Sequence, residues 1–78
     1  MGFRISTTDD DLMFKIVRDN RVTLKAKGLF FFIASCPYAD YFTISGVSKF
    51  LKEGKDAIRS AAHELEEFEY IERVQDNF

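Results

Sequence analysis

Apolar and polar residues alternate with the period of an α-helix in three stretches of the chain. These stretches cover residues 24–35, 44–52 and 55–68, and in each of them apolar residues recur every three or four positions. This spacing places the apolar side chains on one side of a helix, where they can face a shared core. The predicted inward residues are Ala26, Leu29, Phe30, Ile33 and Cys36 in the first helix, Val47, Phe50 and Leu51 in the second, and Ile58, Ala61, Ala62, Leu65 and Phe68 in the third.

Residues with capping chemistry mark the ends of these helices. Thr23 and Thr43 precede the first and second helices, and threonine is a good N-cap because its hydroxyl accepts a hydrogen bond from a free backbone N–H. Pro37 stops the first helix. Gly54 suits the left-handed conformation that closes a helix, so we expect a tight turn between the second and third helices. Two helices joined by such a turn form a helix-turn-helix unit.

Short strand patterns flank the helices. Residues 3–5 and 14–16 alternate apolar and polar side chains, which predicts two short strands with an acidic loop between them. Residues 41–43 predict a very short strand. Residues 70–74 have strand propensity and are followed by turn-forming residues, so we expect a β-hairpin to begin there.

Charge is distributed unevenly along the 78 residues, which carry a net charge of −2. Residues 43–60 have a net charge of +2, whereas residues 61–78 have −5. The positive charge therefore ends midway along the third predicted helix.

Size and cysteine content restrict the class of protein. A chain of 78 residues forms one domain. Cys36 is the only cysteine, which excludes an internal disulfide and indicates a reducing compartment such as the cytoplasm. No apolar run reaches the roughly 20 residues that a membrane span needs. We therefore expect a cytoplasmic protein that does not act at a membrane.

Two separated segments of the sequence resemble a family of DNA-binding domains. They are LKAKGL, residues 24–29, and LKEGKDAIRSA, residues 51–61. These segments resemble the winged-helix N-terminal domains of replication initiators and phage replisome organisers of Gram-positive bacteria, which are related to primosomal DnaD-type proteins. The resemblance covers residues 14–75. It implies a winged helix-turn-helix domain of three helices, mainly α with a small β-hairpin, that binds double-stranded DNA through the helix carrying Arg59.

The chain departs from the family pattern in four places. Glu69 stands where the family usually has a glycine before the tyrosine that opens the wing, so the third helix is expected to end less sharply. Ala62 replaces an expected leucine and Phe68 an expected small residue, and these opposite changes in volume can compensate. The sequence stops at Phe78, where the second strand of the wing should begin. Either the wing is vestigial or residues 1–78 are a fragment of a longer protein.

The third helix carries the candidate DNA contacts on the side that faces away from the core. The predicted DNA-binding residues are Lys52, Lys55, Asp56, Arg59, Ser60 and His63. Lysines neutralise phosphates, and the planar fork of Arg59 matches the O6 and N7 acceptors of guanine in the major groove. The N-terminus of the helix adds free backbone N–H groups for a phosphate. We expect a replication protein of a phage or plasmid type; a transcriptional regulator is a variant of the same hypothesis.

Two observations leave an alternative open. The acidic C-terminal third, with its net charge of −5, favours a winged helix that binds protein without contacting DNA. The run 29–33 is apolar around the whole first helix, and Phe31 points away from its inward side. Either the N-terminal strands cover Phe31 or a second subunit does. We favour a homodimer through this helix, because small domains gain stability by oligomerising.

The remaining polar residues do not form a recognisable reaction centre. His63 is the only histidine, and one histidine among carboxylates on a helix surface rarely binds a metal. Residues 9–11 are acidic but have neither calcium-loop spacing nor a partner base. Cys36 has no basic neighbour to activate it. We expect no catalytic activity, no metal or cofactor, and no small-molecule substrate.

Overall fold

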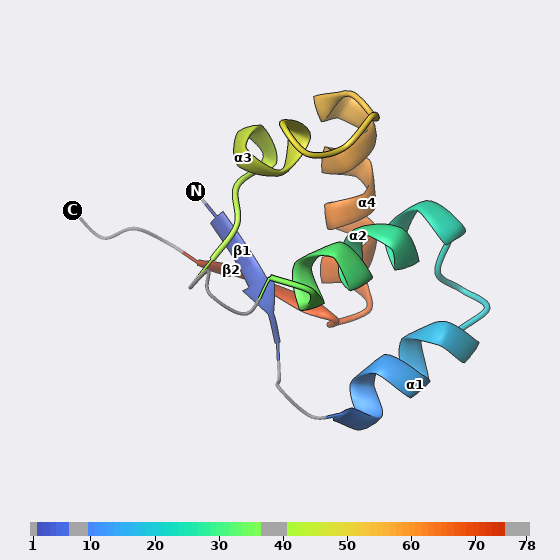
Figure 1. The fold of residues 1–78 in the computed structure, drawn as a ribbon. Coiled ribbons are helices and arrows are strands. Elements are labelled where there is room, and N and C mark those ends of the chain that lie inside the picture. Colours follow the sequence, from blue (N-terminus) through green and yellow to red (C-terminus); the bar gives the residue numbers. More distant parts are fainter. Residues whose placement is uncertain (1, 7–9, 37–40, 75–78) are drawn as a thin grey trace.

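The computed structural model describes residues 2–6, 10–36 and 41–74. In chain order the elements are β1 (Gly2–Ile5), α1 (Asp10–Arg18), α2 (Leu24–Ala34), α3 (Ile44–Ser48), α4 (Lys55–Glu67) and β2 (Ile71–Val74). Helices α2, α3 and α4 surround the core, the two strands lie at its side, and α1 lies along the far side of α2 (Figure 1). The described fold is mainly helical with a small antiparallel sheet.

The three helices predicted from periodicity are confirmed as α2, α3 and α4, and both threonine caps form. The Thr23 hydroxyl accepts a hydrogen bond from the Ala26 N–H at 3.2 Å. The Thr43 hydroxyl accepts one from the Gly46 N–H at 3.0 Å. A carboxylate of α4 supports the first cap, because Glu64 accepts from the Thr23 hydroxyl at 2.9 Å and from its backbone N–H at 2.5 Å. Glu64 thus fixes the start of α2 against α4.

Two predictions for the segment between α3 and α4 are wrong: the end of the second helix at residue 52, and the role of Gly54 as the residue that closes this helix. Helix α3 ends at Ser48. The N–H groups of Lys49 and Phe50 then donate to carbonyls three residues earlier, as in a 3₁₀ turn, and this tighter winding rotates the Phe50 side chain away from the core. Phe50 is therefore 75% exposed rather than inward-facing. Gly54 has φ −73° and ψ 169°, so it is the extended N-cap of α4 and not a left-handed residue that closes α3.

The strand predicted at residues 14–16 is also wrong. These residues belong to α1, which begins at Asp10 and thus includes part of the expected acidic loop. Acidic residues are favoured at the start of a helix by its dipole. Ile16 is fully buried and Leu12, one turn earlier, packs against the core. Phe14 is 63% exposed, so the alternation of apolar residues here follows neither a strand nor one continuous helix face.

The sheet joins the two ends of the described chain. Strands β1 and β2 are antiparallel, with Phe3 opposite Arg73 and Ile5 opposite Ile71. On its other side Phe3 forms a bridge with Phe42 through two backbone hydrogen bonds of 2.7 and 2.8 Å. The strand predicted at residues 3–5 is confirmed as β1, and the strand predicted at residues 70–74 is confirmed from Ile71 onward as β2. The strand predicted at residues 41–43 is only the single bridge at Phe42. β2 therefore pairs with the N-terminal strand, and the return strand of the predicted hairpin lies outside the described residues.

The core follows the predicted inward sides of the helices closely. Its buried residues are Phe3, Ile16, Val22, Ala26, Leu29, Phe30, Ile33, Val47, Ile58, Ala61, Ala62, Leu65, Tyr70 and Ile71. Cys36, Leu51 and Phe68 are only partly buried. Phe31 is half-buried, packs against this core and meets the Phe30 ring edge-on at 5.7 Å. Phe31 is therefore partly covered within a single molecule, and the homodimer through this helix stays a prediction.

A polar cluster anchors the link between α1 and α2 to the start of β2. The Asp19 carboxylate, only 7% exposed, accepts hydrogen bonds from the Arg21 guanidinium at 2.7 and 2.9 Å and from the Tyr70 hydroxyl at 2.7 Å. These donors, Arg21 first, hold the pKa of Asp19 well below its usual range. Burial raises the pKa of Tyr70. The Arg21 guanidinium also lies over the Phe68 ring, 4.5 Å from its centroid.

Candidate nucleic-acid interface

Helix α4 presents a polar side to solvent, as its sequence predicts. Ile58, Ala61, Ala62 and Leu65 form its buried stripe. The outward side carries Asp56, Arg59, Ser60, His63 and Glu67, and all five residues are exposed. The helix is thus rotated as expected, with its candidate DNA contacts accessible.

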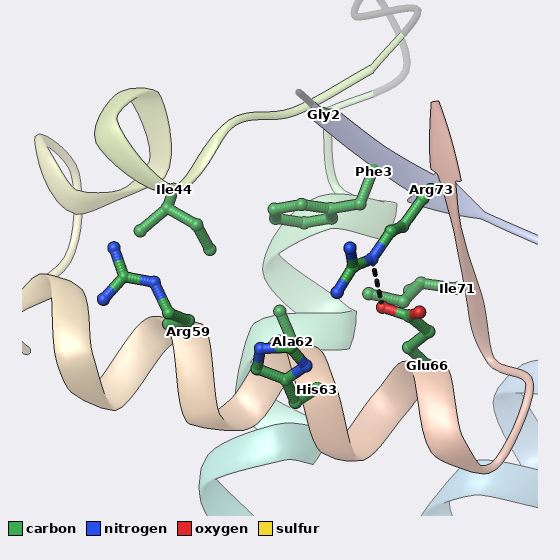
Figure 2. A pocket seen from close by; sticks show the side chains of 9 residues that line it. All are labelled: Gly2, Phe3, Ile44, Arg59, Ala62, His63, Glu66, Ile71 and Arg73. Atoms are coloured by element: carbon green, nitrogen blue, oxygen red, sulfur yellow. Dashed lines mark hydrogen bonds and ion pairs between the residues drawn. The ribbon is translucent and has the colours of Figure 1, made fainter. Parts of the chain in front are cut away.

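A groove of about 190 Å³ lies between this outward side and the sheet. We call it the α4–sheet groove. Its apolar lining comes from Phe3, Ile44, Ala62 and Ile71 (Figure 2). Its polar lining residues are Arg59, His63, Glu66 and Arg73. The groove therefore has an apolar base and three residues that can donate hydrogen bonds to an anion.

The two arginines enter the α4–sheet groove from different elements. Figure 2 shows Arg59 and Arg73 at opposite ends of the groove with His63 between them. The Arg59 guanidinium pairs with Asp56 at 3.0 Å, and the Arg73 guanidinium pairs with Glu66 at 2.9 Å. All four side chains are more than one-third exposed, so these pairs are weak and a phosphate can compete for the arginines.

The structure brings only two of the six predicted site residues together in the α4–sheet groove. Arg59 and His63 line the α4–sheet groove. Lys52 is exposed in the turn before α4, Lys55 is exposed at its first position, and Ser60 is exposed on its outer side. Asp56 acts as the partner of Arg59.

The beginning of α4 has a second feature suited to an anion. Its N-cap Gly54 provides no side-chain hydrogen bond, so no cap side chain occupies the first backbone N–H groups of this 13-residue helix. Lys55 follows directly. Free N–H groups and the positive end of the helix dipole together favour a phosphate at this point.

Two residues of the groove escaped the sequence analysis. Glu66 contributes from α4, and Arg73 contributes because the pairing of β2 with β1 places it beside α4. The sequence contains part of the information needed to predict Arg73. This residue is two positions after Ile71 in a predicted strand, so its side chain lies on the same face of the sheet as that of Ile71. It is also the only cation after Arg59.

The cations do not form one continuous stripe. Lys25 lines a different groove, between α2 and α4. The Lys27 ammonium donates to the Val17 carbonyl at 3.0 Å and so covers the end of α1. Positive side chains around α4 thus alternate with acids, in a mosaic rather than a band.

The described residues show no sign of a metal site or of a membrane span. Within the described residues no cluster of three His, Cys, Asp or Glu side chains has the arrangement of a metal site. None of the described helices has the length and apolarity to cross a membrane. No family model, curated protein or solved structure matches this chain. The resemblance to initiator domains therefore stays a prediction.

Proposed function

We propose that this protein is a duplex DNA-binding module of the winged-helix type in which α4 is the recognition helix. The observation that carries the proposal is the convergence of Arg59, His63 and Arg73, from α4 and β2, on one groove at the exposed side of α4. Cations and hydrogen-bond donors on an accessible helix are what major-groove recognition requires.

The dimensions of α4 suit this role. Lys55 and His63 are eight residues apart, which corresponds to about 12 Å along a helix. The major groove is also about 12 Å wide, so one helix can present both residues to a single groove. In this arrangement Lys55 and the N-terminus of α4 bind a phosphate, and Arg59 reads a base edge. Arg73 binds a phosphate on the opposite strand by exchanging Glu66 for it.

The biological setting is a further part of the proposal. The segments LKAKGL and LKEGKDAIRSA support a replication initiator of phage or plasmid type, acting in the cytoplasm. The second of them includes Lys52, Lys55 and Arg59, so the family resemblance and the candidate site coincide in the same residues.

The test compares Arg59→Ala with Lys55→Ala by fluorescence anisotropy on a selected and a scrambled duplex across a salt series. Arg59→Ala should cost about 1–3 kcal/mol on the selected duplex and much less on the scrambled one. Lys55→Ala should weaken both alike and reduce the salt slope by about one. Lys15→Ala is the matched control, since it removes an exposed cation from α1. Failure of the folded parent protein to bind any duplex at low salt would refute DNA binding.

A second candidate function is protein binding through the same side of α4. Its support is that both arginines of the α4–sheet groove are paired with acids of that helix. Such a mosaic complements the mixed polar surface of a protein better than a uniformly anionic duplex. The anisotropy measurement separates the two, because a protein-binding module gives no signal with either duplex.

A further inference from the structure

Each arginine of the α4–sheet groove is paired with an acid of α4. Arg59 Nη1 donates to Asp56 Oδ1 at 3.0 Å, and Arg73 Nε donates to Glu66 Oε2 at 2.9 Å. Both acids come from α4, whereas the arginines come from α4 and β2. An acid beside a cation reduces the attraction of that cation for phosphates. Binding to the DNA backbone alone therefore does not account for the two acids.

Asp56 lies where it can hold the Arg59 side chain at the surface of the helix. The two residues are three positions apart on α4, so their side chains are neighbours on one side of it. The Asp56 side chain is fully exposed, and that of Arg59 is 53% exposed. Asp56 is also in the first turn of α4, where the helix dipole favours an acid. Its position thus suits both the helix and the arginine.

The hydrogen bond to Asp56 uses a small part of the donor capacity of Arg59. A guanidinium has five N–H donors, and this bond uses one of them, on Nη1. The N–H groups of Nε and Nη2 lie parallel along another edge of the same plane. Two parallel donors are what the O6 and N7 acceptors of guanine require. Arg59 can therefore bind a guanine while it remains bonded to Asp56.

The Asp56 carboxylate changes the balance between two kinds of DNA contact. A phosphate contact depends chiefly on charge, through the release of condensed cations. A bidentate contact to a base edge depends chiefly on the direction of the donors. Pairing with Asp56 offsets the charge of Arg59 but leaves this donor edge, and the offset grows when a duplex excludes water from the pair. The pair therefore weakens contacts to any backbone more than the contact to a matching base.

We propose that Asp56 is a positioning residue that makes Arg59 selective for a base edge over phosphates. This inference rests on the proposed function, in which Arg59 reads a base and Arg73 binds a phosphate. Glu66 differs from Asp56, because Arg73 must exchange it for the phosphate. Loss of Asp56 therefore changes the preference between duplexes, whereas loss of Glu66 changes the affinity for all duplexes alike.

Fluorescence anisotropy with the selected and the scrambled duplex tests the role of Asp56. Asp56→Asn removes the charge and keeps an acceptor oxygen, so it should raise the affinity for the scrambled duplex about threefold and steepen its salt slope by about one. The affinity for the selected duplex should change less, so the ratio of the two affinities falls. Asp56→Ala also removes the acceptor and should lower this ratio about tenfold. Glu66→Gln is the matched control, which should raise both affinities and leave their ratio unchanged.

Repeating Asp56→Asn together with Arg59→Ala separates the pair from a general effect of charge. Without Arg59, the loss of Asp56 should change both affinities by the same factor. All substituted side chains are at least 39% exposed, so circular dichroism should show folded variants. A ratio that falls equally with and without Arg59, or that neither Asp56 variant changes, overturns the role of Asp56 and leaves DNA binding standing. A parent protein that binds no duplex refutes the proposed function, and this inference with it.

Discussion

Glu69 adopts a backbone conformation that its side chain disfavours. Its φ is +65°, the only positive value among the described residues. The Tyr70 N–H bonds to the Leu65 carbonyl at 2.8 Å and the Glu69 N–H to the Glu66 carbonyl at 3.0 Å, which is the Schellman arrangement that ends a helix. The expectation of a less sharp helix end is therefore wrong: α4 stops abruptly, with glutamate in the position that glycine usually takes.

Replacing this residue should stabilise the protein. Glu69→Gly removes the clash of a Cβ in the left-handed region, and we expect a gain of about 1 kcal/mol in the free energy of unfolding. Urea denaturation followed by circular dichroism measures it. The control is Glu67→Gly, an exposed position within α4, which should lose about 1 kcal/mol. A loss at both positions would contradict the left-handed assignment.

Asp19 predicts how stability depends on pH. Its pKa is lowered in the folded state, so the charged carboxylate stabilises the protein above the unfolded value of about 3.9. This contribution should decrease as the pH falls below about 4 towards the lower folded pKa. We expect urea midpoints of the parent protein to fall over this range. Asp19→Asn should start lower at pH 7 and lose less on acidification; an identical slope would show that other carboxylates govern the acid response.

At the scale of elements, α4 holds both the core and the site. Leu65 is fully buried at the centre of its inward stripe. Leu65→Ala should destabilise the protein by about 2–4 kcal/mol through lost burial and a residual cavity. Thermal or urea unfolding tests this, with Ser60→Ala on the exposed side as a control expected to change stability by less than about 0.5 kcal/mol. Equal effects would mean that α4 is rotated and that Arg59 does not face outward.

The spacing of apolar residues predicts those helices in which one side is apolar and buried and the other is polar and exposed. α2 and α4 fall within a residue or two of their predicted bounds, because their apolar spacing and caps are local properties. α1 was missed because Phe14 and Val17 are apolar and yet exposed, which obscures the helical period.

At the scale of the whole molecule, the α4–sheet groove depends on contacts between distant parts of the sequence. The helical period alone predicts that Arg59 and His63 lie together on the exposed side of α4. Arg73 joins them only because Gly2 to Ile5 pair with Ile71 to Val74, and no local pattern specifies which strands pair. We expected a hairpin partner for β2, so Arg59 and His63 were predicted to share a surface, whereas Arg73, which the sheet contributes, was not.

The pairing of β1 with β2 also has a consequence for biosynthesis. The ribosome releases β1 early, and its partner strand follows almost seventy residues later. At about 5–20 residues per second, β1 waits roughly 3–14 s for β2. Helices α2 to α4 can pack during this interval, because their contacts are closer in sequence, whereas Phe3 has no completed site to enter. The groove containing Arg59, His63 and Arg73 is therefore incomplete until β2 has emerged, and a nascent chain cannot use it before then.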